Sequence, residues 1–418
     1  MRQFLLIMGI LSLLMDWYVY QGIKKITANW KSERARRWVR QGYWAFFILL
    51  IISFAYTFYL RFSTDDTYPF MKWVISAFLT FFVTKLVFIL VLFSEDIFRL
   101  IVAAFRLFSG TKQQDGTGNQ FLPERRKFVS QLALLVAAIP FSAFIYGIFK
   151  GKYAYKVHRH TLYFEDLPAA FDGFTITQIS DVHSGSFDNK EAVQRGIDLI
   201  NAQKSDLFVF TGDLVNDVAT EIEPYMPLFS QIKAPFGQYS ILGNHDYGMY
   251  TDWKSVEERN QNLEKLKKHH SELGYRLLLD EHVEIEKNGE KITLLGVENW
   301  GTGFIELGDL DKALTGVATN AFKVLLSHDP SHWEERVKVH PTQVHLTLSG
   351  HTHGMQFGIE TPLGKWSPVK YRYKNWAGLA EENGRRLYIN RGFGFIGFSG
   401  RVGIWPEITV LELKRGKA

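Results

Sequence analysis

The first 150 residues alternate long apolar runs with short polar segments. The apolar runs cover about residues 4–23, 43–60, 71–93 and 128–149. Each run is close to the roughly 20 residues that an α-helix needs to cross the hydrocarbon core of a bilayer. A cleaved signal peptide cannot explain four runs. The pattern therefore predicts a membrane domain, residues 1–150, built as an all-α bundle of four transmembrane helices.

From about residue 160 the pattern changes to short apolar strands that alternate with helices. Residues 189–203 and 253–273 have helical spacing, and residues 283–297 predict a hairpin that turns at Asn288-Gly289. Alternating strands and helices are typical of an α/β layered domain. We expect residues 151–418 to form this domain, with strands at residues 174–180, 206–210, 239–242, 323–326 and 345–348.

Charge divides the chain in the same way. Residues 1–160 carry a net charge of +13 and the remainder −8, against +5 for the whole chain. Seven Lys and Arg lie in residues 24–41 and six in 94–127, but one lies in 61–70. Because cytoplasmic loops are enriched in Lys and Arg, we expect a multi-pass membrane protein whose second domain lies on the extracytoplasmic side. The basic residues flank apolar runs, which argues against nucleic acid as a partner.

Two charged residues, Asp16 and Lys85, fall inside the apolar runs. Charges within a membrane are costly and mark either a polar site between helices or a structural arrangement. The structural arrangement is a mutual ion pair, or a Lys85 side chain that reaches the membrane surface and an Asp16 that lies at it. The spans hold no further cluster of acidic or His residues, so we favour a structural arrangement. The chain also contains no cysteine, which excludes disulfides, Fe–S clusters, Cys-ligated zinc and a thiol nucleophile.

Five short polar clusters follow the predicted strands of the second domain. Ligands of open α/β sheets collect beyond the strand ends, so we expect the clusters to converge. Their carboxylates, carboxamide oxygen and imidazoles suit Mn, Fe or Zn. Seven ligands that share one carboxylate would hold two ions for phosphoryl displacement. The clusters are Asp181-Val182-His183, Gly212-Asp213, Gly243-Asn244-His245-Asp246, Ser327-His328 and Gly350-His351-Thr352-His353.

Three glycines stand beside these ligands, at Gly212, Gly243 and Gly350. Glycine lets the backbone turn sharply where a strand ends, which would aim the next side chain at the metals.

In these five ordered blocks the chain resembles the calcineurin-like metallophosphoesterases. The resemblance covers most of residues 160–415 and implies a four-layer α/β/β/α sandwich. It also implies two divalent metal ions, which we expect to be Mn, with Fe or Zn as alternatives. Asp181, His183 and His353 resemble the ligands of the first ion, Asn244, His328 and His351 those of the second, and Asp213 the bridging carboxylate.

The same resemblance gives roles to the two residues after Asn244. His245 resembles the family's histidine that donates a proton to the leaving oxygen. Asp246 would orient His245 and keep it protonated. His332 competes with His328 as a ligand, but His328 directly follows a predicted strand.

Finer details resemble a membrane-linked subgroup, the YkuE/YaeI-like phosphoesterases. They include Leu326-Ser327-His328-Asp329-Pro330 and Tyr388-Ile389-Asn390-Arg391-Gly392. This subgroup usually has Gly-Gly-Gln after the last motif, where this chain has Gly354-Met355-Gln356. The difference affects a neighbour of the ligands, so it bears on substrate contacts rather than on the metals.

Two segments near the C-terminus are candidates for substrate or membrane contact. Arg391 and Arg401 flank a Gly- and Phe-rich stretch, and we favour Arg391 as a substrate-binding residue because guanidinium matches phosphate oxygens. Residues 366–376 are basic and aromatic. They fit either a contact with anionic lipid headgroups or an ordinary surface loop.

These observations predict a membrane-anchored phosphoesterase with a phosphorylated, lipid-linked or envelope substrate and the bilayer as partner. One alternative is a pyrophosphatase acting on UDP-2,3-diacylglucosamine, whose substrate lies on the cytoplasmic side. Others are an exported nucleotide or cell-wall phosphodiesterase and a non-catalytic phosphate-binding membrane sensor.

Overall fold

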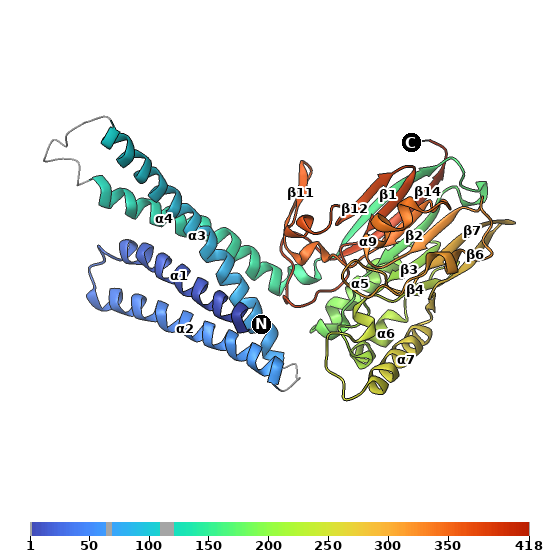
Figure 1. The fold of residues 1–418 in the computed structure, drawn as a ribbon, viewed down its shortest axis with the longest axis horizontal. Coiled ribbons are helices and arrows are strands. Elements are labelled where there is room, and N and C mark those ends of the chain that lie inside the picture. Colours follow the sequence, from blue (N-terminus) through green and yellow to red (C-terminus); the bar gives the residue numbers. More distant parts are fainter. Residues whose placement is uncertain (1, 64–68, 109–120, 418) are drawn as a thin grey trace. The chain divides into compact units, whose positions relative to one another are not determined.

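The computed structural model describes residues 2–63, 69–108 and 121–417. The chain divides into two compact units, Met1–Tyr146 and Gly147–Ala418. The first unit consists of helices, and the second contains the strands (Figure 1).

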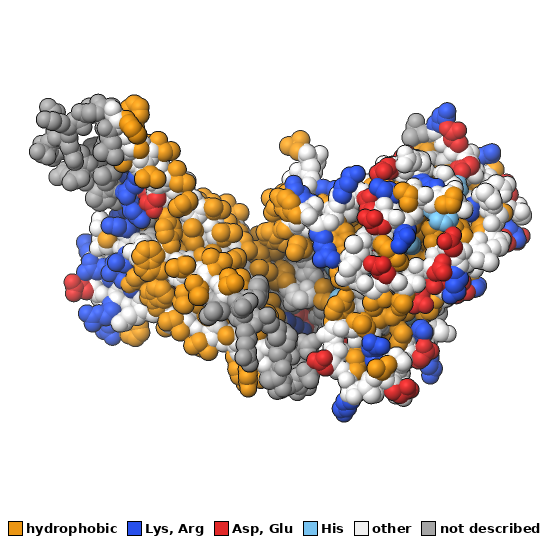
Figure 2. Space-filling model, in the orientation of Figure 1, with side chains coloured by type: hydrophobic (Ala, Val, Ile, Leu, Met, Phe, Trp, Pro, Cys, Tyr) orange, Lys and Arg blue, Asp and Glu red, His pale blue; other side chains and the backbone are white. Residues whose placement is uncertain are grey.

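The first unit contains the helices α1 (Arg2–Ile26), α2 (Glu33–Ser63), α3 (Pro69–Phe108) and most of α4 (Phe121–Phe149). Each predicted apolar run lies inside one of them. Three helices in the described part of the chain are long and apolar enough to cross a membrane, over Glu33–Leu60, Phe70–Phe105 and Arg125–Phe149. The first run forms the helix α1, which is not among these three. Hydrophobic side chains cover much of the visible surface of this unit, as expected for helices that face lipid (Figure 2).

A buried ion pair joins α1 to α3. Lys85 Nζ lies 3.0 Å from Asp16 Oδ1, and the Tyr43 hydroxyl of α2 donates to the same oxygen at 2.8 Å. The two charges predicted inside apolar runs are therefore partners of one another. Their contacts connect three helices, so a structural role accounts for both residues.

The second unit contains two six-stranded sheets. In the first, order β1-β14-β2-β3-β4-β5, the neighbours β2, β3 and β4 are parallel. In the second, order β12-β13-β9-β8-β7-β6, the neighbours β7, β8, β9 and β13 are parallel. The first sheet consists of β1 (Lys156–Phe164), β14 (Glu407–Arg415), β2 (Phe174–Ile179), β3 (Leu207–Thr211), β4 (Gln238–Ile241) and β5 (Arg276–Leu277). The second consists of β12 (Gly378–Glu382), β13 (Arg385–Ile389), β9 (Leu346–Ser349), β8 (Lys323–Leu326), β7 (Glu290–Gly296) and β6 (Glu281–Lys287).

A separate two-stranded hairpin consists of β10 (Ile359–Thr361) and β11 (Gly364–Trp366). The α-helices of this unit are α5 (Lys190–Ala202), α6 (Met226–Phe229), α7 (Val256–Leu273), α8 (Leu310–Leu314) and α9 (Pro330–Glu335). The 3₁₀ helices are η1 (Gly151–Tyr153), η2 (Ala169–Phe171), η3 (Ser184–Ser186), η4 (Ala219–Tyr225), η5 (His245–Tyr247), η6 (Val337–Val339), η7 (His353–Gln356) and η8 (Pro368–Tyr371).

Three buried clusters hold these elements together. One combines apolar residues of both sheets, such as Ile176 and Leu346. A second joins the first sheet to α5, α6 and α7, and a third joins the second sheet to α8 and α9. Alternate side chains of a strand point to opposite faces of its sheet, and here apolar residues lie on both faces. The three clusters therefore cover both faces of each sheet.

Candidate metal centre

The polar clusters predicted from the sequence meet at one place. Asp181 and His183 follow β2, Asp213 follows β3, and Asn244 follows β4, all in the first sheet. His328 follows β8, and His351 and His353 follow β9, in the second sheet. The carboxyl ends of parallel strands lie at the same edge of a sheet, so the two edges together bring the seven side chains close.

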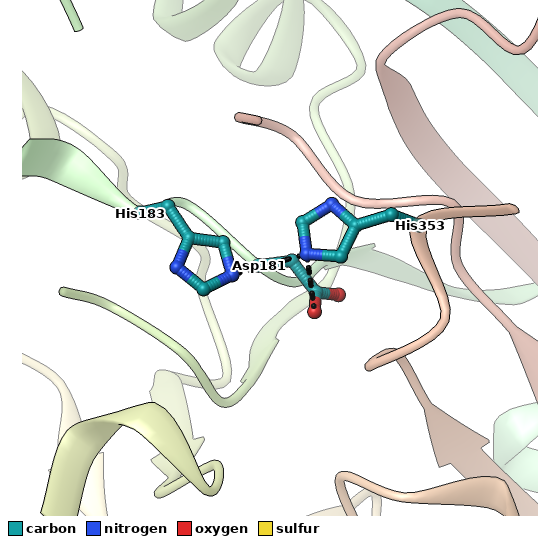
Figure 3. A group of neighbouring side chains, drawn as sticks. All are labelled: Asp181, His183 and His353. Atoms are coloured by element: carbon teal, nitrogen blue, oxygen red, sulfur yellow. Dashed lines mark hydrogen bonds and ion pairs between the residues drawn. The ribbon is translucent and has the colours of Figure 1, made fainter. Parts of the chain in front are cut away.

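One group of possible ligands consists of Asp181, His183 and His353 (Figure 3). The Nε2 atoms of His183 and His353 lie 3.0 Å apart, and His353 Nε2 lies 3.2 Å from Asp181 Oδ1. All three side chains are buried. The donor atoms of this first group point toward one another, as the ligands of one ion do.

A second group consists of Asp213, His328 and His351. The Asn244 carboxamide oxygen lies 2.9 Å from His351 Nδ1 and so joins this group. His328 Nδ1 donates to the Thr211 carbonyl at 2.7 Å, which turns its Nε2 toward Asp213 Oδ2 at 3.2 Å. The backbone of β3 thus fixes which nitrogen of His328 faces the centre.

Asp213 lies between the two groups. Its Oδ2 atom is 3.5 Å from His183 Nε2 in the first group and 3.2 Å from His328 Nε2 in the second. This is the position that a carboxylate shared by two ions would occupy.

Burial keeps most of the imidazoles neutral. It lowers the pKa of His183 to about 3 and that of His351 to about 4, and it holds the pKa of His353 well below the usual value. Burial would also lower the pKa of His328, but the Asp213 carboxylate outweighs it and raises that pKa to about 10. Neutral imidazoles and carboxylates that face one another fit a divalent cation, which accepts lone pairs from both.

The backbone at these residues is strained. Asp181, His183, Asp213, His351 and His353 all have positive φ, between 46° and 72°. This left-handed region is unfavourable for residues with a side chain and persists only where the surroundings enforce it. Five such residues in one centre indicate that packing around the strand ends enforces the geometry for a function.

The three neighbouring glycines serve two different purposes. Gly212 has φ +91° and does provide the expected turn. At Gly243 and Gly350 a Cβ atom would collide with the carboxylates of Asp213 and Asp181, respectively. These two glycines are needed because a carboxylate passes close to the backbone, which the sequence argument about turns did not anticipate.

His245 lies at the rim of the centre. Its ring centroid is 4.9 Å from that of His183, and its backbone N–H donates to Asp213 Oδ1 at 2.9 Å. Its Nδ1 donates to the Asn216 carbonyl at 2.7 Å. The other ring nitrogen, Nε2, is therefore the one available to exchange a proton with a substrate.

Asp246 does not orient His245, and this corrects the expectation from the sequence. Its carboxylate accepts backbone N–H groups of Gly243 at 2.8 Å, Asp213 at 2.9 Å and Leu214 at 2.8 Å. Consecutive residues of a tight turn point in different directions, so Asp246 faces the β3 loop while Asn216 holds His245. Asp246 instead holds the loops that carry Asp213 and Asn244 together.

Arg391 is also placed differently from the expectation. Its guanidinium is buried and contacts Glu407 at 2.5 Å and Glu360 at 2.6 Å, so two carboxylates occupy the donors expected to bind phosphate. Arg401 lies nearer the centre, with Nη2 at 3.2 Å from His353 Nδ1. It is fully buried and donates to the Gly394 carbonyl at 2.6 Å. Both arginines therefore have structural contacts in place of exposed donors.

Two residues that the sequence did not assign contact His351. Asp329 Oδ2 lies 3.2 Å and the Tyr373 hydroxyl 2.8 Å from its Nε2 atom, so Nδ1 is left facing Asn244. The position of Asp329 directly after the candidate ligand His328 was the available signal, but Tyr373 is distant in sequence and had none. The competitor His332 contacts Ser327 Oγ at 2.8 Å and belongs to neither ligand group.

The two units match two family models. Residues 1–152 match the model described as "Probable Calcineurin-like phosphoesterase, transmembrane domain". Residues 174–355 match the model "Calcineurin-like phosphoesterase". The second match includes every residue of both ligand groups.

Individual relatives agree with these matches. The metallophosphoesterase YkuE of Bacillus subtilis is 29% identical over 69% of this chain and 97% of its own length. A transmembrane protein with metallophosphoesterase domain from Danio rerio is 26% identical over 99% of this chain and 89% of its own. A metallophosphoesterase of Aquifex aeolicus is 27% identical over 63% of this chain and 93% of its own. The chain is therefore a calcineurin-like metallophosphoesterase, a hydrolase of phosphoesters whose catalytic domain follows an N-terminal transmembrane domain.

Proposed function

We propose that this protein is a dinuclear phosphoesterase that hydrolyses a phosphoester or pyrophosphate bond in a lipid-linked or envelope substrate. The observation that carries the proposal is the position of Asp213 between two groups of carboxylate and imidazole donors. In the first group Asp181, His183 and His353 would hold one ion, and in the second Asn244, His328 and His351 would hold the other. Manganese fits this mixed donor set, and iron or zinc would fit as well.

The metal ions would supply Lewis acidity toward the phosphoryl oxygens and would activate a water molecule at neutral pH. The protein's own contribution is to fix the donors before substrate arrives. Buried side chains, a strained backbone and the contacts of Asp246 with three backbone N–H groups all oppose rearrangement of the loops.

We infer that His245 acts as the general acid. The Asn216 carbonyl fixes Nδ1 as a donor, which leaves Nε2 to deliver a proton to the leaving oxygen. The ring of His245 lies beside that of His183, so this proton would be close to the first group of proposed metal ligands.

The transmembrane domain supports a substrate in or near the bilayer, because anchoring concentrates an enzyme on membrane substrates. We propose four spans, with α1 as the first, and a domain boundary near residue 150. Lys and Arg are concentrated in residues 24–41 and 94–127, which favours a catalytic domain on the extracytoplasmic side of a bacterial inner membrane. The three core clusters support a four-layer α/β/β/α sandwich for that domain.

The test is hydrolysis by the full chain, purified in detergent and loaded with Mn. The substrates are bis-p-nitrophenyl phosphate, a phosphomonoester, UDP-diacylglucosamine, polyprenyl pyrophosphate and phospholipids. We expect a lipid-linked compound to be preferred, with loss of activity in Asp213→Ala and His245→Ala. A strong preference for soluble nucleotides would favour an exported phosphodiesterase. Turnover of none of these compounds with metal bound would favour a phosphate sensor.

A further inference from the structure

The β10–β11 hairpin and the segment after it expose an unusual number of large apolar side chains. Leu363, at the turn of the hairpin, is 99% exposed, and Ile359 is 62% exposed. Trp366 and Tyr371 are also exposed. The hairpin projects from the two large sheets in Figure 1, and hydrophobic atoms lie at its end in Figure 2. We call residues 359–374 the hairpin patch.

The hairpin patch is basic as well as apolar. Lys370, Arg372 and Lys374 are exposed along it. Its one acidic residue, Glu360, contacts the buried Arg391 at 2.6 Å. Lys374 Nζ lies 4.0 Å from Oε2 of Glu382, which is outside the patch, so the patch itself keeps an excess of basic residues. Aromatic and aliphatic side chains interleaved with Lys and Arg are typical of protein surfaces that lie in the headgroup region of a bilayer.

The base of the hairpin lies next to the end of the span α4. Gly358 N–H donates to the Val402 carbonyl at 2.9 Å, and Val402 N–H donates to the Gln356 carbonyl at 2.7 Å. The neighbouring Arg401 donates its N–H to the Gly147 carbonyl at 3.2 Å. Gly147 is part of the last turn of α4, whose candidate span ends at Phe149. Since a span ends at the membrane surface, this chain of contacts keeps the hairpin base close to that surface.

We propose that the hairpin patch inserts its apolar tip into the bilayer interface, with its basic residues on anionic phospholipid headgroups. A second copy of the chain is a poorer occupant, because it would bring the same basic residues together. Anionic headgroups of the membrane carry the complementary negative charge, and the candidate span in α4 would already anchor the chain there.

The hairpin patch also contacts the metal centre. The Tyr373 hydroxyl lies 2.8 Å from His351 Nε2 in the second ligand group. Insertion of the patch would therefore hold the centre at the depth of the headgroups, where the phosphate of a lipid-linked substrate lies. This last step rests on the proposed function, whereas insertion itself does not.

The absence of cysteine from the chain allows a direct test. Leu363→Cys in the full chain is labelled with a polarity-sensitive fluorophore and placed in nanodiscs of phosphatidylcholine with or without phosphatidylglycerol. We expect blue-shifted emission that lipid-borne quenchers reduce, with a larger effect when phosphatidylglycerol is present. The control is Lys268→Cys on the exposed side of α7, which should report water in both lipids.

Two outcomes would overturn the proposal. Water-like emission at position 363 in both lipids would show that the tip remains in solvent. A blue shift that lipid-borne quenchers do not reduce would show that it packs against protein instead. Lys370→Glu with Lys374→Glu should remove the phosphatidylglycerol effect, and an unchanged effect would exclude the headgroup contact.

The same samples separate this inference from the proposed function. Emission reports insertion whether or not any substrate is turned over. If Leu363→Asp raises KM at least tenfold for a bilayer substrate, but not for bis-p-nitrophenyl phosphate, then the hairpin patch delivers membrane substrates. If lipid-borne quenchers reduce the emission of the label at position 363 but no lipid phosphate is hydrolysed, the proposed lipid-linked substrate is wrong and the proposed insertion stands.

Discussion

At the scale of single residues, Asp329 contacts the proposed metal ligand His351 without belonging to either ligand group. Its carboxylate lies 3.2 Å from His351 Nε2, and the Tyr373 hydroxyl is 2.8 Å from the same atom. A carboxylate in this position orients the ring and makes the opposite nitrogen a better ligand. We expect Asp329→Asn to weaken metal binding by about 10- to 100-fold. Titration of the metal-free protein with Mn measures the effect.

A matched control is Asp252→Asn, which changes the same chemical group at an exposed position. It should leave Mn affinity unchanged. Wild-type affinity in Asp329→Asn would mean that Tyr373 and packing suffice to hold His351. Loss of the folded state, seen by circular dichroism, would identify a structural defect instead.

Asp246 offers a second prediction at this scale. Its buried carboxylate accepts N–H groups from Gly243, Asp213 and Leu214. An amide replaces one acceptor by a donor that would face N–H groups, and each unsatisfied buried donor costs about 1–3 kcal/mol. We expect Asp246→Asn to lower the free energy of unfolding by about 3 kcal/mol, measured by denaturant titration of the catalytic activity and of tryptophan fluorescence.

This prediction separates the two roles considered for Asp246. If Asp246 only oriented His245, Asp246→Asn would change kcat and its pH profile, and the denaturant concentration at the unfolding midpoint would equal that of the wild type. Such a result would restore the interpretation made from the sequence. Asn216 contacts His245 through its backbone carbonyl, so changing its side chain does not test that contact.

At the scale of elements, Arg391 and Glu407 connect the two sheets. Arg391 follows β13 of the second sheet, and Glu407 begins β14 of the first. Burial raises the pKa of Glu407, but Arg391 outweighs this and lowers it to about 2. The pair thus stabilises the fold above the unfolded-state pKa of about 4.3, and this contribution is lost as the pH falls from there toward 2.

The expected loss across that pH range is on the order of 3 kcal/mol, since one pKa unit corresponds to about 1.4 kcal/mol. Thermal unfolding of wild type and of Arg391→Met with Glu407→Leu, at pH values from neutral to acid, measures it. The apolar pair replaces both charges, so neither is left buried without the other. Glu360, the second partner of Arg391, is 32% exposed and can turn to solvent. We expect its stability to fall less steeply in acid. Parallel curves for the two proteins would mean that other carboxylates dominate acid unfolding.

The elements also show what the sequence could reveal. The strands before the ligands were predictable because each is a short apolar run that ends in a polar cluster, as in β8 (Lys323–Leu326) before His328. The insertion of β14 between β1 and β2 was not, because no local pattern encodes the pairing of residues 407–415 with residues 156–164. Ligand types follow from composition and order. The direction of the Asp246 side chain depends on backbone N–H groups of the loop after β3. The direction of the Arg391 side chain depends on Glu360 and Glu407, which lie elsewhere in the sequence.

At the scale of the whole molecule, the catalytic domain begins inside the last helix of the transmembrane domain. The second unit starts at Gly147, within α4. The Gly147 carbonyl accepts the Arg401 N–H at 3.2 Å, and Lys152 contacts Asp188 at 2.6 Å. Arg401 in turn lies 3.2 Å from His353 Nδ1. The end of the helix therefore supports a residue that contacts a proposed metal ligand.

This connection predicts that the catalytic domain depends on residues before position 160. A chain of residues 160–418 lacks Gly147, η1 and the first four residues of β1 (Lys156–Phe164), which pairs with β14. Arg401 then loses the Gly147 acceptor, and the β14 backbone loses part of its partner strand. We expect this fragment to hydrolyse bis-p-nitrophenyl phosphate at least tenfold more slowly than a fragment of residues 143–418, and to unfold at lower temperature. Equal rates and equal Tm would mean that the spans are only a tether, as in an exported phosphodiesterase.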